Sequence, residues 1–243
     1  VKAFYDWTGQ TSLYISMETH GRENIIEGLD LSRTVGWFTS MFPMLLSIER
    51  DASWDAIIKS IKEQVRDISK KGIHYGIARY LKNNAEIPDY PQPQISFNYL
   101  GQFDQGHDTG SLYQLVPNWS SSNIKRDEKR GHLIDIVGSI NDEKLQVTWF
   151  FSKAMFKPER VKEVAHNYMK ALREIITHCL TQEAGGYTRS DFPLATLSQR
   201  DIDEYLSSKR NIVDVYPLTP MQEGMLFHTV YEQGAGDYIF QLE

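Results

Sequence analysis

Acid–base side chains are concentrated in one short segment near the start of the chain, Glu18-Thr-His-Gly-Arg-Glu23, which holds two carboxylates, an imidazole and a guanidinium. Residues 12–17 precede it and alternate apolar with polar side chains, the pattern of a strand with one buried face. A strand end that opens into a glycine-containing loop holds reactive groups still while it admits a substrate. A charged turn alone is most often a solvated loop, so the interpretation depends on other segments.

Two later segments carry the polar and aromatic groups that this chemistry would need. Residues 33–43, Arg-Thr-Val-Gly-Trp-Phe-Thr-Ser-Met-Phe-Pro, interleave aromatic, glycine and hydroxyl residues; alone, they predict a loop whose aromatic rings fill the core. Residues 97–102, Phe-Asn-Tyr-Leu-Gly-Gln, predict a strand that ends in glycine, and its aromatic residues are mostly core. A Tyr99 hydroxyl can donate to a developing oxyanion, and Asn98 can orient it.

In that order, the three segments resemble the signature motifs of epimerization domains of nonribosomal peptide synthetases. Such domains invert the α-carbon of an amino acid or peptide held as a thioester on a carrier domain. A fourth family motif, Pro-x-x-Gly-x-Gly-Tyr-Gly, is altered here, because Ser69 replaces the proline and His74 replaces a glycine. Thr19 also stands where the family usually has glycine. These departures affect local loop geometry and leave the acid–base residues in place.

The resemblance implies specific roles for four residues. Glu18 matches the catalytic acid/base of the family, and Arg22 matches a residue near the active centre. Asn98 and Tyr99 match active-site positions of the Phe-Asn-Tyr-Leu-Gly motif. On the same basis we expect a second set of residues to bind substrate: His20, Trp37, Phe38 and Thr39.

The second catalytic residue of the family lies outside these motifs. It is the second histidine of a His-His-x-x-x-Asp-Gly motif that the preceding lobe carries. The chain has seven histidines, none adjacent to another, so we expect this fragment alone to be inactive. No metal site is expected, because His166 and His178 share a predicted helix without a ligand partner three or four residues away.

Inversion of an α-carbon beside a thioester would need acid–base and hydrogen-bonding groups in one place. An α-proton beside a thioester is weakly acidic, so its removal needs a placed base and stabilisation of the enolate oxygen. Inversion also needs a proton delivered to the opposite face of the carbon. We therefore expect Glu18 to face a gap shared with a partner lobe, within reach of Asn98 and Tyr99.

Hydrophobic periodicity predicts a fold of the α/β (α+β) class, with a mixed sheet flanked by helices. The resemblance implies a chloramphenicol acetyltransferase-like lobe of the condensation/epimerization family, paired with an N-terminal lobe around a tunnel. The predicted run 42–48 is nearly all apolar, as in a strand covered on both faces, and Cys179 falls on the buried stripe of its helix. Strands are predicted at 12–17, 42–48, 94–100, 111–116, 133–140, 144–151 and 238–242, and helices at 53–69, 76–83, 158–181, 198–206 and around 221–230.

Three regions are predicted along the chain. Residues 1–185 form the C-terminal lobe of an epimerization domain, and residues 186–215 are polar enough to be an inter-domain linker. Residues 216–243 begin with Tyr-Pro-Leu-Thr-Pro-Met-Gln-Glu-Gly-Met-Leu-Phe-His, which resembles the opening of a condensation domain. The chain starts without methionine and reads as an excerpt from a longer polypeptide.

The composition of the chain limits the kinds of partner that it is expected to bind. The net charge of −6 (26 basic minus 32 acidic residues) gives no electrostatic reason to bind nucleic acid. No apolar run approaches the roughly 18 residues that span a membrane, and the N-terminus lacks a leader pattern. One cysteine fits a cytoplasmic protein. The resemblance implies a peptidyl carrier protein domain, the N-terminal lobe and a downstream condensation domain as partners, with 4′-phosphopantetheine supplied by the carrier and no cofactor bound directly.

Two alternatives remain open from the sequence. One is a condensation domain, which has the same fold but forms a peptide bond. Condensation lobes usually lack the pair of motifs at residues 18–23 and 97–101, so their presence favours epimerization. The other is a non-catalytic fragment that only docks carrier proteins.

Overall fold

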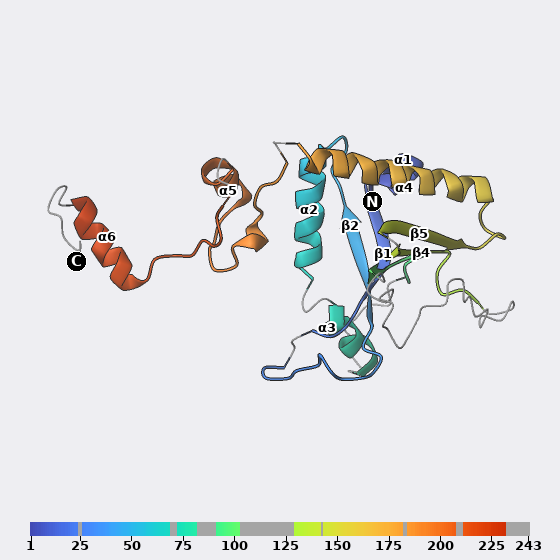
Figure 1. The fold of residues 1–243 in the computed structure, drawn as a ribbon, viewed down its shortest axis with the longest axis horizontal. Coiled ribbons are helices and arrows are strands. Elements are labelled where there is room, and N and C mark those ends of the chain that lie inside the picture. Colours follow the sequence, from blue (N-terminus) through green and yellow to red (C-terminus); the bar gives the residue numbers. More distant parts are fainter. Residues whose placement is uncertain are drawn as a thin grey trace. The chain divides into compact units, whose positions relative to one another are not determined.

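The computed structural model describes residues 1–23, 26–68, 72–81, 91–102, 129–141, 143–181, 184–207 and 211–231. The chain divides into two compact units, Val1–Ala184 and Gly185–Glu243. The first unit contains a mixed sheet flanked by helices, as the hydrophobic pattern predicted (Figure 1).

The sheet of the first unit has five strands in the order β2-β1-β3-β4-β5. The two outer pairs, β1 with β2 and β4 with β5, are antiparallel, and the central pairs, β1 with β3 and β3 with β4, are parallel. The central strands therefore come from segments far apart in the sequence. Their bounds are β1 Ser12–Thr19, β2 Ser40–Ser47, β3 Ile95–Gln102, β4 Ile134–Asn141 and β5 Lys144–Phe151.

Three helices bury the apolar face of this sheet: α1 (Lys2–Thr8), α2 (Trp54–Arg66) and α4 (Pro158–Cys179). Figure 1 shows α4 lying across the sheet beside α1, with α2 alongside β2. Side chains of α1 and α4 form one core cluster with β4, and β1 and β2 form a second cluster against which α2 packs. Pro158 in the first turn of α4 and the Ser53 cap of α2 start these helices within one residue of the predicted positions 158 and 53.

Strand register places alternate residues of neighbouring strands on the same face. Ile15 is paired with Ile95, and Ile95 with Ile134, so these isoleucines share the face that the helices cover. Ser16 is paired with Ser96, and Ser96 with Asp135, so polar residues share the other face. Because side chains alternate along a strand, the same register determines which candidate site residues meet.

Two burial predictions were wrong. The run at 42–48 is not covered on both faces, because Leu45 in its middle is 60% exposed. The strand is instead at the sheet edge, with Phe42, Met44 and Leu46 buried on the helix-covered side. Cys179 is exposed, because it is the last residue of α4, beyond the part of the helix that packs on the core.

The segment after α2 also differs from the prediction. A short helix α3 (Ile73–Gly76) continues into a π-helical turn at Ile77–Leu81, so the helix predicted at 76–83 begins earlier. The helix predicted at 53–69 ends at Arg66, and Gly72 caps the start of α3. The strand predicted at 111–116 and the one at 238–242 lie outside the described residues.

The second unit is built from short helices. A 3₁₀ turn at Arg189–Asp191 is followed by α5 (Gln199–Tyr205) and α6 (Pro220–Tyr231). The Ser198 hydroxyl caps α5 by accepting from the Asp201 amide, and the Asp201 carboxylate accepts from the Ser198 amide in return. The Tyr187 hydroxyl accepts from the Ile212 amide at 2.9 Å, which ties residues that were predicted to be a linker into this unit.

Candidate functional site

The central observation is a hydrogen bond between two predicted site residues on adjacent parallel strands. The Asn98 side-chain amide donates to the Glu18 carboxylate at 2.5 Å, across 80 residues of sequence. The register brings them together, because Met17 is paired with Phe97 and the next residues along both strands point to the opposite face. The carboxylate is thereby held on the polar face of the sheet by a neutral donor.

The surroundings of Glu18 favour its protonated form. Partial burial raises the pKa of the Glu18 carboxyl group, His132 lowers this pKa, the Asp135 carboxylate raises it, and the hydrogen bond from Asn98 lowers it. Together these effects raise the pKa of Glu18 above the ordinary value of a glutamate. A carboxylate with a raised pKa is a stronger base than an ordinary surface carboxylate, which suits the transfer of a weakly acidic proton.

A polar cluster that sequence reasoning missed continues along the same face toward β4. The Ser96 hydroxyl donates to Asp135 at 2.6 Å, and His132 Nδ1 lies 3.2 Å from the same carboxylate oxygen. The Arg130 guanidinium donates to the other oxygen of Asp135. The available signal was the alternation in β3 and β4, which places Ser96 and Asn98 on the face of Asp135.

Arg22 does not contact Glu18 through any hydrogen bond described for it. Its guanidinium donates to the carbonyls of Leu31 at 2.7 Å and Gly36 at 3.4 Å, and it stacks over the Phe38 ring at 4.3 Å from the centroid. A planar guanidinium with several donors suits this combination of carbonyl bonding and ring stacking. In this geometry Arg22 organises the loop before β2.

Gly21 allows that loop to approach the strand end. Its φ is +65°, and a Cβ placed there would lie 1.6 Å from the Phe38 carbonyl oxygen. Only glycine fits both the left-handed backbone and the close contact. The segment after Glu18 and the segment before β2 therefore meet backbone to backbone.

Tyr99 lies on the opposite face of the sheet from Glu18 and Asn98. It is paired with Gly138, and its ring lies 3.3 Å from where a Gly138 Cβ would be, on the face of Ile134 and Ile136. The expectation that Tyr99 would lie with Asn98 beside Glu18 was wrong, because adjacent residues of a strand point to opposite faces. Its ring is half exposed.

This placement leads to a prediction for Tyr99→Phe. Because the hydroxyl is on the other face from Glu18, we expect the substitution to change the rate of α-proton exchange by less than about tenfold, below the effect typical of a placed acid/base group. Exchange of the α-proton for deuterium on a carrier-bound aminoacyl thioester measures it. A loss of a hundredfold or more would show that the hydroxyl takes part in the reaction.

The predicted substrate-binding residues fall into two groups. Phe38 and Thr39 line an open cavity of about 480 Å³, together with Ser16, Tyr75 and His132. Trp37 is 90% exposed and does not fill the core, and His20 is exposed with Nε2 3.3 Å from Glu23. The loop therefore contributes one ring and one hydroxyl to the cavity.

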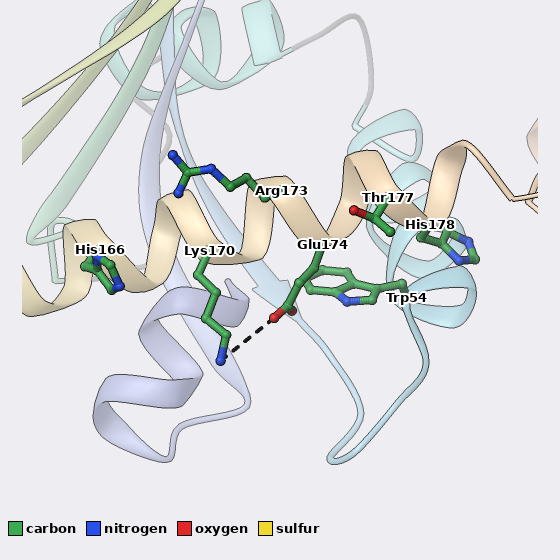
Figure 2. A pocket seen from close by; sticks show the side chains of 7 residues that line it. All are labelled: Trp54, His166, Lys170, Arg173, Glu174, Thr177 and His178. Atoms are coloured by element: carbon green, nitrogen blue, oxygen red, sulfur yellow. Dashed lines mark ion pairs between the residues drawn. The ribbon is translucent and has the colours of Figure 1, made fainter.

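A second cavity, of about 500 Å³, lies on the outer side of α4 and is lined by residues that were not predicted as a site. Figure 2 shows Lys170 reaching toward Glu174, whose carboxylate is 3.8 Å away, with Trp54 of α2 beside it. His166 and His178 lie at opposite ends of this groove. Among the described residues, no group of histidine, cysteine and acidic side chains could hold a metal ion.

Comparison with known proteins identifies the family. Residues 3–194 match the model of the condensation domain. The chain belongs to the condensation domain family. Two subunits of linear gramicidin synthase from Brevibacillus parabrevis are 52% and 50% identical to it, over 98% and 99% of its length. The predicted resemblance to peptide synthetases is confirmed.

One solved structure is similar in both sequence and fold. The epimerization domain from the third module of tyrocidine synthetase B is 34% identical, with a TM-score of 0.67, over 74% of this chain and 40% of that structure.

The chain spans only 5% and 3% of the lengths of the two gramicidin synthase polypeptides. In the part of the chain that the structure describes, no helix has the length and hydropathy of a membrane span.

Proposed function

We propose that residues 1–185 are the C-terminal lobe of an epimerization domain, in which Glu18 moves the α-proton of a carrier-bound aminoacyl or peptidyl thioester. The observation that carries this proposal is the half-buried Glu18 carboxyl group, hydrogen-bonded to Asn98 and raised in pKa. The motif resemblance and the similarity to a solved epimerization domain support it.

The proposed reaction has two proton transfers. A base on one side of the substrate removes the α-proton, and an acid on the other side returns a proton to the opposite face of the planar enolate. Glu18 is one of these groups. The imidazole of the N-terminal lobe, expected from the family resemblance, is the other. Which group acts first on the L-substrate depends on the face that the thioester presents.

Asn98 is the proposed partner that keeps Glu18 in place. Its amide donates to the carboxylate in the deprotonated state, and its hydrogen bond lowers the pKa of Glu18, against the effect of burial. A neutral donor fixes the orientation of the carboxylate without adding a positive charge next to it. Such positioning allows the group to exchange protons without first reorganising.

The substrate and neighbours follow from the same proposal. The thioester would be on the 4′-phosphopantetheine arm of a peptidyl carrier protein domain. The N-terminal lobe would close the tunnel over the polar face of the sheet. Residues 186–215 would link the domain to a downstream condensation domain that begins near residue 216. The cavity beside Phe38 and Thr39 is the proposed place for part of the substrate.

The test uses the intact synthetase module that contains this chain, with its carrier domain loaded with an L-aminoacyl thioester. We expect the released amino acid to become a D/L mixture and the α-proton to exchange with deuterium in D₂O. Chiral chromatography and mass spectrometry measure the two outcomes. A released product that stays entirely L, without deuterium, would reject the proposal.

Condensation is the second candidate, because the matching family model is that of the condensation domain. The same module, offered a downstream aminoacyl carrier, distinguishes the two reactions. Amide formation without racemisation of the upstream residue, in a module whose downstream condensation domain is inactivated, would assign condensation to this domain. If the domain bound the loaded carrier but catalysed neither epimerization nor condensation, it would be a non-catalytic domain that docks carrier proteins.

A further inference from the structure

We propose that His132, held by Asp135, is a positioning residue that controls the electrostatic environment in which Glu18 takes up and releases its proton. This inference rests on the proposed function and adds a residue that lies outside the three motifs. It concerns the polar cluster formed by Ser96, Arg130, His132 and Asp135 on the face of the sheet that carries Glu18.

His132 lies two residues before β4, and two contacts fix it there. Its Nδ1 lies 3.2 Å from Asp135 Oδ1, and its side chain is only 18% exposed. Its backbone carbonyl also accepts a hydrogen bond from Arg130 Nε at 3.2 Å. A histidine whose ring contacts a carboxylate and whose backbone is tied in this way has one preferred ring orientation.

Asp135 connects this histidine to the strand that carries Asn98. It accepts from the Ser96 hydroxyl at 2.6 Å, and Ser96 is two residues from Asn98 on the same strand and face. Asn98 in turn donates to Glu18. The Ser96–Asp135 and Asn98–Glu18 hydrogen bonds are therefore neighbours on one face of the sheet. His132 lies at one end of this row of polar side chains, and Glu18 lies at the other.

The other charged groups of the described residues near Glu18 contact other partners. From its own segment, His20 lies 3.3 Å from Glu23, and Arg22 donates to the carbonyls of Leu31 and Gly36. Across the strand pair toward β2, Glu18 is opposite Met41, which carries no charge.

On the β4 side, Arg130 donates to Asp135. In the part of the chain that the structure describes, His132 and Asp135 act on Glu18 in opposite directions: a protonated imidazole favours the carboxylate, and the aspartate opposes it.

His132 also lines the cavity that Phe38 and Thr39 line. A substrate that enters this cavity would lie against the imidazole that influences Glu18. Through His132, binding of a substrate in this cavity would therefore affect the charge on Glu18.

The test measures the pH dependence of kcat/KM for α-proton exchange in the intact module. His132→Gln keeps a polar side chain beside Asp135 but cannot carry the positive charge of an imidazolium, so we expect the acidic limb, which Glu18 sets when it acts as the base, to move to higher pH by about 0.5–1 unit. His132→Arg restores a fixed cation, and its limb should return to the wild-type position or lower. His166→Ala, in the groove outside α4, is the matched histidine control and should leave the limb unmoved.

Two outcomes would overturn the inference. One is an acidic limb that stays in place in both His132 variants while the plateau falls, which is the pattern of a purely structural role. The other is a His132→Arg limb that follows His132→Gln to higher pH. Thermal unfolding by circular dichroism checks that each variant is folded.

A direct titration separates this inference from the proposed function. The ¹³C signal of the Glu18 carboxyl group, assigned by its loss in Glu18→Gln, reports its pKa without catalysis. A pKa that rises in His132→Gln and returns in His132→Arg supports the positioning role even if no exchange occurs. In that case the proposed epimerization alone would be rejected. A pKa that is the same in all three proteins would reject the positioning role.

Discussion

Glu18→Gln in the intact module is expected to lower α-proton exchange and D-product formation by about 10²–10⁴-fold, the contribution of one positioned acid/base group. Glutamine keeps the shape of the side chain and an oxygen that can accept from Asn98, but it cannot take up and return a proton. Loading of the carrier should be unchanged, because that step does not use this carboxyl group. Chiral analysis of the released amino acid and the rate of deuterium incorporation measure the effect.

The stability of this variant provides its control. Because the pKa of Glu18 is raised in the folded state, its contribution to stability is present at low pH and is lost as the pH rises through the raised value. Glutamine carries no charge to desolvate, so Glu18→Gln should be at least as stable as the wild type at pH 7. Urea unfolding at pH 7 tests this. Wild-type exchange by a folded variant would reject Glu18 as the acid/base.

Gly21→Ala is expected to destabilise the protein by about 2–5 kcal/mol, since a left-handed residue with a Cβ costs about 1–2 kcal/mol and a backbone clash about 1–3 kcal/mol. The added Cβ would lie 1.6 Å from the Phe38 carbonyl oxygen, which belongs to the backbone and cannot rotate away. The loop that Arg22 organises must therefore move, and α-proton exchange should fall with it. Urea unfolding and the exchange rate measure the two effects.

Gly28→Ala is a matched control from the same stretch of chain. Gly28 also has a positive φ, +78°, but none of the described residues lies within 4 Å of a Cβ built there. It should therefore show only the backbone part of the cost, about 1–2 kcal/mol. If both variants lost the same stability, the close contact between Gly21 and Phe38 would have no energetic weight.

Elements with strong periodicity were predicted well from the sequence. The strands predicted at 12–17, 133–140 and 144–151 appear as β1, β4 and β5, and the helix predicted at 158–181 appears as α4. These predictions worked because the period of the side chains and the local turn residues act over a few residues. Burial was predicted less well, as Leu45 in an edge strand and Cys179 at the end of α4 show, because it depends on what packs against each position.

The sequence by itself determined the family, through three motifs in order, and it singled out Glu18 and Asn98 as residues of one site. Only the tertiary structure decided which of the candidates meet. Parallel pairing of β1 with β3 brings Asn98 to Glu18, and the alternation of side chains turns Tyr99 to the other face. The pairing of β3 with β4 also brings Asp135, and His132 just before that strand, to the same face. The physical reason is that pairing and register are set by long-range packing of the sheet against its helices, which no local pattern of residues contains.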